Sequence, residues 1–276
     1  LGGPRRVGAR RRLGGPRRVI PVDLNCSVTG PDEAPVLLLG GSLGTTLEMW
    51  DPQLPALSQT HRVIRFEHRG HGGSPVPTGP YTMDELGADV LAMLDRLDLR
   101  RVSYCGLSIG GMVGQWLAIN APERIDRLVL LCTSAFLPPP EGWHQRAAAV
   151  REAGSPEVVA DAVLARWFTP DYAESHRDVV ARYRAMIAGI DPEGYAGCCE
   201  AIAGMDLRSG LPGIAAPTLV VAGRQDPSIP PEHGEAIAAA VPGARLEILD
   251  PAAHLASVER ADAVTALIAA HLGGGT

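Results

Sequence analysis

The sequence predicts an α/β fold in which helices flank a mostly parallel central sheet and a helical cap is inserted between two strands. Two observations indicate this fold. Short apolar runs bounded by Gly, Pro or Asp alternate with segments whose apolar residues recur at helical spacing. One long interval, residues 134–205, breaks this alternation because it has helical segments but no strand-like run. The 276 residues are enough for one large domain with a buried core.

Six apolar runs are expected to be buried parallel strands, because they are short and rich in Val, Leu and Ile. These runs cover residues 36–39, 62–66, 102–105, 127–132, 218–222 and 245–249. Helices are expected between or after them, at residues 83–97, 109–119, 232–240 and 258–272. This order of strands and helices predicts a sheet with helices on both faces.

The interval at residues 134–205 is expected to form a cap. Its helical segments lie near residues 145–152, 157–168 and 179–187, after Pro138-Pro139-Pro140 has ended the preceding strand. Open α/β sheets bind ligands at the carboxyl edge of their strands, so this insertion is placed to cover that edge. The alternative is a thicker helical layer. The core then comprises residues 19–133 and 206–276.

The charge of the chain is unevenly divided. Residues 1–18 contain seven arginines and no acidic residue, and they repeat LGGPRRV at positions 1–7 and 13–19. The rest of the chain therefore contains the other 18 basic residues and all 31 acidic residues. The composition of residues 1–18 predicts a disordered leader, which is either a basic binding arm or a segment foreign to the native protein. A nucleic-acid partner is not expected for so acidic a body.

The cysteines and the length of the apolar runs indicate where in the cell the protein is expected. The five cysteines are an odd number, and none has the paired spacing of a zinc site, which favours a reducing environment. No apolar stretch approaches the roughly 20 residues that cross a bilayer. We therefore expect a cytoplasmic protein without a membrane partner, and the oligomeric state is left open.

Gly106-Leu107-Ser108-Ile109-Gly110 is a G-x-S-x-G motif. It stands between an expected strand and an expected helix, the context in which such a serine acts as a nucleophile. The two glycines permit a tight turn that exposes the Ser108 hydroxyl, and the N-terminus of the helix favours developing negative charge. An ordinary glycine-rich strand–helix turn is the alternative.

A serine hydroxyl needs a base that an acid orients, and in this architecture the acid and the histidine follow the serine in that order. Asp226 follows the fifth expected strand and His254 follows the sixth, so both emerge at the same edge as the serine. Asp250 is a rival acid, although a structural role in its turn is expected. His233 and His271 lie in or after helices and are expected to be solvated.

The loop Gly40-Gly41-Ser42-Leu43-Gly44-Thr45 follows the first expected strand. The peptide N–H groups of Ser42 and Ile109 are the expected donors of an oxyanion hole. A phosphate-binding role is disfavoured because no Lys-Ser/Thr pair follows this loop and the G-x-G-x-x-G spacing is absent.

With these residues placed, the chain resembles the α/β-hydrolases and, over residues 34–268, the 3-oxoadipate enol-lactonases among them. The matching segments are Ser42-Leu43-Gly44-Thr45, Met49-Trp50-Asp51, Arg69-Gly70-His71-Gly72, Gly79-Pro80-Tyr81-Thr82, Gly106 to Met112, Leu130-Leu131-Cys132-Thr133, Arg166 to Pro170 and Gly194 to Cys199. The last two segments lie in the cap and are the more specific, because caps diverge with substrate. The chain departs from the family at Gly40-Gly41, where Ser-Asn is expected, and at Glu67-His68, where Asp and a small residue are common.

The resemblance implies hydrolysis of 3-oxoadipate enol-lactone to 3-oxoadipate in the degradation of protocatechuate and catechol. It implies that Ser108 attacks the lactone carbonyl, that His254 accepts the serine proton and that Asp226 orients the imidazole. Water then releases the acyl-enzyme. No metal and no cofactor are required.

The implied partner is a small anionic lactone. Its carboxylate needs a counter-charge on an acidic protein, and an arginine of the cap is the natural choice. Trp143 and Arg146, expected on the first cap helix, are the candidates for substrate binding. Packing within the cap is an equal alternative for both.

Other functions fit the same residues. A carboxylesterase, a C–C bond hydrolase or a perhydrolase would share the triad, so only the cap segments argue against them. A haloalkane dehalogenase is excluded because it needs a carboxylate where Ser108 stands. A ligand-binding protein with a vestigial site is disfavoured by the complete set of Ser108, Asp226 and His254.

Overall fold

The computed structural model describes residues 19–273, so the leader expected at residues 1–18 lies outside the described residues. Within them, one sheet has the strand order β1-β3-β2-β4-β5-β6-β7. β1 runs antiparallel to β3, and the other neighbouring strands are parallel. The strands are β1 (Cys26–Thr29), β2 (Val36–Gly40), β3 (Arg62–Phe66), β4 (Val102–Leu107), β5 (Ile125–Leu131), β6 (Thr218–Gly223) and β7 (Arg245–Leu249). The α/β class with a mostly parallel sheet is confirmed.

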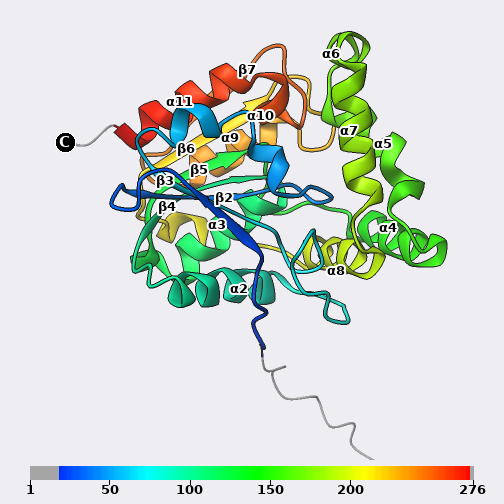
Figure 1. The fold of residues 1–276 in the computed structure, drawn as a ribbon, viewed down its shortest axis with the longest axis horizontal. Helices are drawn as coiled ribbons and strands as arrows, with labels where there is room; N and C mark the ends of the chain where they lie inside the picture. Colours follow the sequence, from blue (N-terminus) through cyan, green and yellow to red (C-terminus); the bar gives the residue numbers. More distant parts are fainter. Residues whose placement is uncertain (1–18, 274–276) are drawn as a thin grey trace, which may run out of the picture.

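Helices cover both faces of this sheet because its central strands carry apolar side chains on both sides (Figure 1). Along β2, for example, Leu38 packs into one hydrophobic cluster while Leu37 and Leu39 pack into the other. One face is covered by α2 (Met83–Arg96), α3 (Ile109–Asn120) and α9 (Pro231–Ala240), and the other by α1 (Leu54–Leu57), α10 (Ala256–Glu259) and α11 (Ala261–Gly273). Short 3₁₀ helices lie at η1 (Leu47–Trp50), η2 (Pro122–Arg124) and η3 (Leu211–Gly213).

Five helices lie between β5 and β6, in the interval for which the sequence predicts a cap, and stand beside the sheet in Figure 1. They are α4 (Pro140–Ala153), α5 (Glu157–Trp167), α6 (Pro170–Ser175), α7 (Arg177–Ala188) and α8 (Pro192–Ala203). Ion pairs join some of these helices. Arg151 of α4 contacts Glu193 in the first turn of α8 and Glu200 two turns further on, at 2.7 and 2.6 Å.

Local sequence explains where these elements begin. The hydroxyl of Thr82 accepts a hydrogen bond from the Glu85 N–H at the start of α2, and the Glu85 carboxylate accepts one from the Thr82 N–H. This capping box satisfies peptide N–H groups that have no partner within the helix. Asp191 does the same for α8, where it accepts hydrogen bonds from the N–H groups of Glu193 and Gly194.

Some elements of the fold, among them β1 and α8, were not expected from the sequence. β1 has four residues and a part-exposed burial pattern, so its pairing with β3, rather than a local apolar run, defines it. α8 contains two glycines and two cysteines, which are weak helix formers. It gains close packing instead: a Cβ on Gly70 would lie 2.1 Å from the Gly194 Cα, so the backbones meet where only glycine fits. The short helix α6 was also missed.

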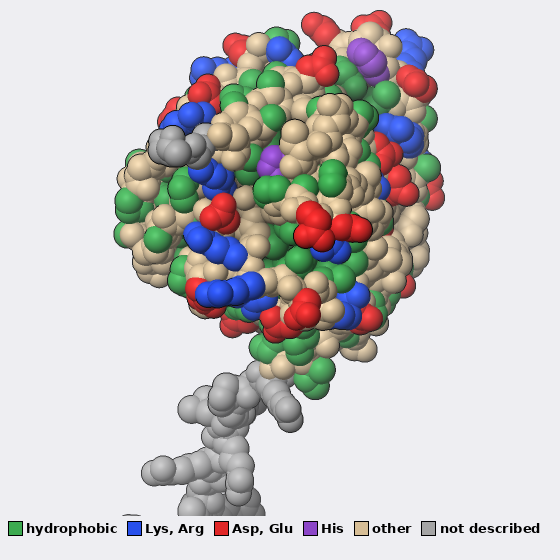
Figure 2. Space-filling model, turned by 60° about the vertical axis from the view of Figure 1, so that its left-hand side comes forward, with side chains coloured by type: hydrophobic (Ala, Val, Ile, Leu, Met, Phe, Trp, Pro, Cys, Tyr) green, Lys and Arg blue, Asp and Glu red, His purple; other side chains and the backbone are tan. Residues whose placement is uncertain are grey.

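The surface carries interspersed charges. On the face that Figure 2 shows, arginine and acidic side chains alternate rather than gather by sign. Ion pairs such as Arg124–Asp95 and Arg96–Asp23, at 2.8 and 2.6 Å, have this arrangement. No helix among residues 19–273 is both long and apolar enough to span a membrane.

Candidate active site

Ser108 stands in a strained turn between β4 and α3. Its φ of +57° and ψ of −118° are rare for a residue other than glycine. A Cβ on Gly106 would lie 2.3 Å from the backbone of Gly110, and one on Gly110 would lie 2.3 Å from the Gly40 carbonyl oxygen. The turn is held by hydrogen bonds from the Ser108 N–H to Leu131 O (3.0 Å) and from Thr133 Oγ1 to Ser108 O (2.7 Å). Both glycines of the motif are therefore needed for this turn.

His254 and Asp226 form a buried hydrogen-bonded pair. His254 Nδ1 lies 2.7 Å from Asp226 Oδ2, and both side chains are almost fully buried. The other carboxylate oxygen accepts hydrogen bonds from the N–H groups of Ser228 (2.8 Å) and Ile229 (3.0 Å). A carboxylate beside Nδ1 holds the proton there, which leaves Nε2 free to accept a proton. This is the arrangement that a general base requires.

The structure also places the other acids and histidines that the sequence singled out. Asp250 is exposed, and the acid that contacts His254 is Asp226. His271 was expected to be solvated, and this is wrong: it is 8% exposed, its Nε2 lies 3.1 Å from Pro217 O, and burial lowers its pKa. His233 is half-buried, with Nδ1 2.8 Å from Ser134 Oγ. Helical position alone did not reveal these tertiary contacts.

A pocket lies where the cap meets the sheet. It brings together Ser108, His254 and the two residues predicted to bind substrate, Trp143 and Arg146. Its lining comprises Ser42, Leu43, Ser108, Leu137, Trp143, Arg146, Val163, Arg166, Trp167, Tyr195, Ser228, Ile229 and His254. Its lining mixes apolar side chains with a few polar groups, as in small-molecule sites.

The loop after β2 lines this pocket through Ser42 and Leu43. The Ser42 N–H, which the sequence suggests as an oxyanion donor, points to Met49 Sδ at 3.4 Å. Among the described residues, the Leu43 N–H has no hydrogen-bond acceptor. Ile109 is the first residue of α3, where peptide N–H groups have no intrahelical partner. The role of Ser42 stays a prediction, and Leu43 is the alternative donor that the geometry introduces.

Two arginines of the cap line the pocket. Arg146 lies over the Trp143 ring, with its guanidinium carbon 4.7 Å from the ring centre. Arg166, which the sequence analysis did not select, lines the same pocket from the end of α5. Neither arginine has an ion-pair partner among residues 19–273. The sequence offered one reason to select Arg166, because this residue belongs to a cap segment that carries the family resemblance. The two side chains bring unpaired positive charge to the pocket.

Hydrogen bonds join the loop that carries His254 directly to the cap. The N–H of His254 points to Arg166 O at 3.4 Å, and the N–H of Leu255 donates to Trp167 O at 2.9 Å. The Glu259 carboxylate accepts hydrogen bonds from the N–H groups of Ala253 (3.0 Å) and Thr169 (3.3 Å). The end of α5 and the histidine loop therefore form one hydrogen-bonded unit. Within the part of the chain that the structure describes, no cluster of three or more His, Cys, Asp or Glu residues could hold a metal ion.

These features define a class of protein. The sheet order, the strained serine at the end of β4 and the buried His–Asp pair at the carboxyl edge are the parts of an α/β-hydrolase. The family model described as "alpha/beta hydrolase fold" matches residues 34–261. The chain belongs to this family and is a hydrolase.

Relatives define the family more narrowly. The chain is 40% identical to 3-oxoadipate enol-lactonase 2 of Acinetobacter baylyi over 242 residues, which covers 88% of this chain and 90% of that protein. It is similar to the crystal structure of the enol-lactonase from Burkholderia xenovorans LB400, with 44% identity, a TM-score of 0.89, and coverage of 91% and 96%. A hydrolase from Pseudomonas aeruginosa PA01 gives 48% identity, a TM-score of 0.89, and coverage of 92% and 95%. The chain belongs to the 3-oxoadipate enol-lactonase family.

Proposed function

We propose that the chain hydrolyses 3-oxoadipate enol-lactone to 3-oxoadipate, through an acyl-enzyme on Ser108, in the degradation of protocatechuate and catechol. The observation that carries this proposal is one pocket that holds both Ser108 and His254 and two arginines without ion-pair partners. The identity with enol-lactonases, given above, supports the same substrate. The cytoplasmic location expected from the sequence stays a prediction.

In the first step, the Ser108 oxygen attacks the lactone carbonyl carbon while His254 Nε2 accepts the serine proton. Asp226 keeps the other proton on Nδ1 and stabilises the imidazolium. Negative charge grows on the carbonyl oxygen, where the Ile109 N–H and a loop N–H, from Ser42 or Leu43, donate to it. The ring C–O bond then breaks, and the enolate takes the proton from His254 and becomes the ketone.

In the second step, water replaces the leaving group. His254 takes a proton from the water, whose oxygen attacks the acyl carbonyl, and the proton returns to the Ser108 oxygen as the ester bond breaks. The product is a dicarboxylate, with one carboxylate from the lactone side chain and one from the opened ring. None of these steps uses a group outside the side chains, the peptide N–H groups and water.

Arg146 and Arg166 have the charge to bind the side-chain carboxylate of the lactone. Charge-assisted hydrogen bonds from a guanidinium to a carboxylate are stronger and more directional than those from a neutral donor. The acidic body makes local positive charge important, because residues 19–276 contain 31 acidic residues and 18 basic ones, which repel an approaching anion. The pair therefore favours an anionic lactone over a neutral ester.

The test compares two substrates on the same enzyme. Enol-lactone generated in situ should be hydrolysed with a kcat/KM at least about 100-fold above that of a neutral aryl acetate, because only the lactone uses the arginines. Ser108→Ala should abolish turnover of both. Equal kcat/KM values would point to a general carboxylesterase. Turnover of the aryl ester that persists in Ser108→Ala would remove the serine from the mechanism.

A further inference from the structure

The oxyanion loop, residues 41–44, is held at both ends by histidines of one neighbouring loop. His68 Nε2 lies 3.1 Å from the Gly41 carbonyl oxygen. At the other end, the Gly44 N–H donates to His71 Nε2 at 3.0 Å. The two contacts bracket Ser42 and Leu43, the residues whose peptide N–H groups lie at the pocket. A shift of either end would therefore move both N–H groups.

The partners fix the protonation of each ring. The Gly41 carbonyl can only accept, so His68 carries its proton on Nε2. The Gly44 N–H can only donate, so His71 Nε2 is unprotonated, and its Nδ1 carries the proton 3.3 Å from Arg69 O. Burial lowers the pKa of His68 to about 4 and that of His71 to about 3, so both rings are neutral near pH 7. The two histidines hold the loop with opposite tautomers.

The contact at Gly41 also reaches the nucleophile turn. The carbonyl oxygen that faces His68 accepts a second hydrogen bond from the Gly110 N–H, at 3.1 Å. Gly110 directly follows Ile109, the other expected oxyanion donor. One carbonyl therefore links the His68 ring, the oxyanion loop and the first turn of α3, so that the two donors are positioned relative to each other.

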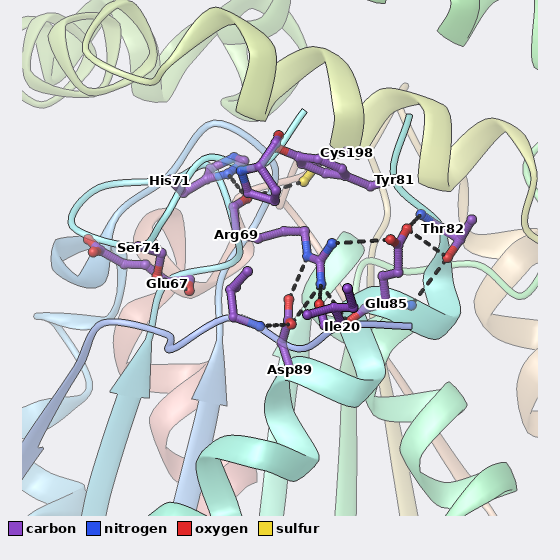
Figure 3. Close-up of polar contacts among 12 residues, drawn as sticks. Ile20, Glu67, Arg69, His71, Ser74, Tyr81, Thr82, Glu85, Asp89 and Cys198 are labelled. Atoms are coloured by element: carbon purple, nitrogen blue, oxygen red, sulfur yellow. Dashed lines mark hydrogen bonds and ion pairs between the residues drawn. The ribbon is translucent and has the colours of Figure 1, made fainter. Parts of the chain in front are cut away.

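The loop that carries the histidines is itself anchored on α2, as Figure 3 shows. Arg69 contacts both carboxylate oxygens of Asp89, from Nε at 2.6 Å and from Nη2 at 2.7 Å, and both side chains are almost fully buried. The Glu67 carboxylate accepts hydrogen bonds from the N–H groups of Gly73 (2.7 Å) and Leu47 (3.2 Å). The histidines therefore have a rigid base from which to hold the oxyanion loop.

The two departures from the family pattern meet at this point. Gly40-Gly41 and Glu67-His68 are separate in the sequence, yet the His68 ring contacts Gly41 O and packs edge-on against Phe66, with 5.2 Å between ring centres. A Cβ on Gly40 would lie 2.4 Å from the Tyr104 hydroxyl, so a larger residue there would displace Tyr104. One departure, His68, is thus in direct contact with the other, Gly41.

We propose that His68 and His71 are positioning residues, which hold the oxyanion loop so that its peptide N–H groups stabilise the transition state. The inference rests on the proposed function only in requiring Ser108-dependent ester hydrolysis, and it is independent of the lactone as substrate. Misplaced donors lose stabilisation of the oxyanion rather than affinity for the ground state, so the effect falls on kcat.

The experiment compares leucine and glutamine at each position, with aryl acetate as substrate. Glutamine can replace the Nε2–H donor of His68 and the Nε2 acceptor of His71, whereas leucine can replace neither. His68→Leu and His71→Leu should lower kcat about 10- to 100-fold with KM within about twofold, and the glutamine variants should recover most of it. His61→Leu, at the amino end of β3, is the matched control and should keep wild-type kinetics.

A second readout uses phenylboronic acid, which forms a tetrahedral adduct with the serine and needs the same donors. Its Kd should rise in the leucine variants in parallel with the loss of kcat. In the wild-type protein, ¹⁵N NMR of the rings should show an Nε2–H tautomer for His68 and an Nδ1–H tautomer for His71 at pH 7. The tautomers test the two contacts even if the leucine variants do not fold.

The inference fails if folded leucine variants keep wild-type kcat, if glutamine recovers nothing, or if the NMR spectra show the same tautomer in both rings. A failure of the proposed function looks different. In that case the wild-type protein has no Ser108-dependent turnover of the aryl ester, or turns over the lactone no better than the ester.

Discussion

The sheet edge and the cap meet at one pocket, but they satisfy their polar groups in different ways. At the sheet edge, Asp226 is bonded to His254 and to two peptide N–H groups, and both side chains are buried. On the cap, Trp143 and Arg146 are only half-buried, and Arg166 is exposed at the pocket without an ion-pair partner. Bond making needs groups that are already oriented, whereas recognition of an anion needs charge that is still available.

The arginines of the cap differ in their partners, and the exposed Arg177 and Arg182 have no ion pair among residues 19–273. Two that do not line the pocket are paired: Arg151 with Glu193 and Glu200, and Arg184 with Glu157. Arg146 and Arg166, which line the pocket, are not. The cap thus uses some arginines to join its helices and keeps others for the pocket.

The largest expected effect is at the sheet edge. Asp226→Asn should lower kcat about 10⁴-fold, because an amide that donates to Nδ1 stabilises the tautomer in which Nε2 is protonated. Steady-state kinetics with the enol-lactone measure this. Asp250→Asn is the control and should stay within about twofold of wild type. A comparable loss in Asp250→Asn would contradict the pairing of Asp226 with His254.

The next effect concerns the anchor beneath the oxyanion loop. Asp89→Leu removes the carboxylate that pairs with two nitrogens of the buried Arg69 and leaves only the longer contact with Glu85, at 3.5 Å, so the free energy of unfolding should fall by about 3 kcal/mol. Denaturant titration measures it. The double variant Arg69→Met/Asp89→Leu should recover much of the loss, because no buried charge remains unpaired. If the single variant were as stable as wild type, the anchor would be dispensable.

The buried histidines make stability depend on pH. The unfolded chain binds protons on His68 and His71 below about pH 6.5, whereas burial keeps the folded pKa values at about 4 and about 3. The stabilisation is therefore complete above about pH 6.5 and is lost as the pH falls toward 4, by up to about 1.4 kcal/mol per pH unit for each ring. In the double variant His68→Gln/His71→Gln, the free energy of unfolding should therefore change less between pH 6 and pH 4 than in the wild-type protein. Denaturant titrations at several pH values measure this.

The smallest effect belongs to the cap. Arg146→Ala or Arg166→Ala should raise KM for the lactone about 10-fold, with a smaller change in kcat, because each removes a charge-assisted hydrogen bond to the substrate carboxylate. The KM for the neutral aryl acetate should not change. Arg177→Ala, at an exposed arginine of α7 that does not line the pocket, is the matched control and should leave both KM values unchanged. A rise in both KM values would indicate damage to the pocket rather than loss of charge.

Local patterns were sufficient for much of the fold. The strands could be located because runs of Val, Leu and Ile are short and bounded by turn residues, and β3 and β7 have the predicted limits. The expectation that β7 is buried is wrong, because β7 lies at the edge of the sheet and none of its residues is buried. β1 and α8 could not be found in this way. β1 depends on its pairing with β3, and α8 depends on the contact of Gly194 with Gly70, which is distant in the sequence.

The sequence by itself determined the fold class and selected Ser108, Asp226 and His254 as candidates, with Asp250 as a rival acid, because turns at strand ends and the order of the strands are local properties. Only the tertiary structure decided that Asp226 rather than Asp250 contacts His254, that Arg166 joins the pocket, and that His68 and His71 hold the oxyanion loop. The physical reason is that a hydrogen bond or an unpaired charge depends on which distant segments meet, and no pattern within one segment records that contact.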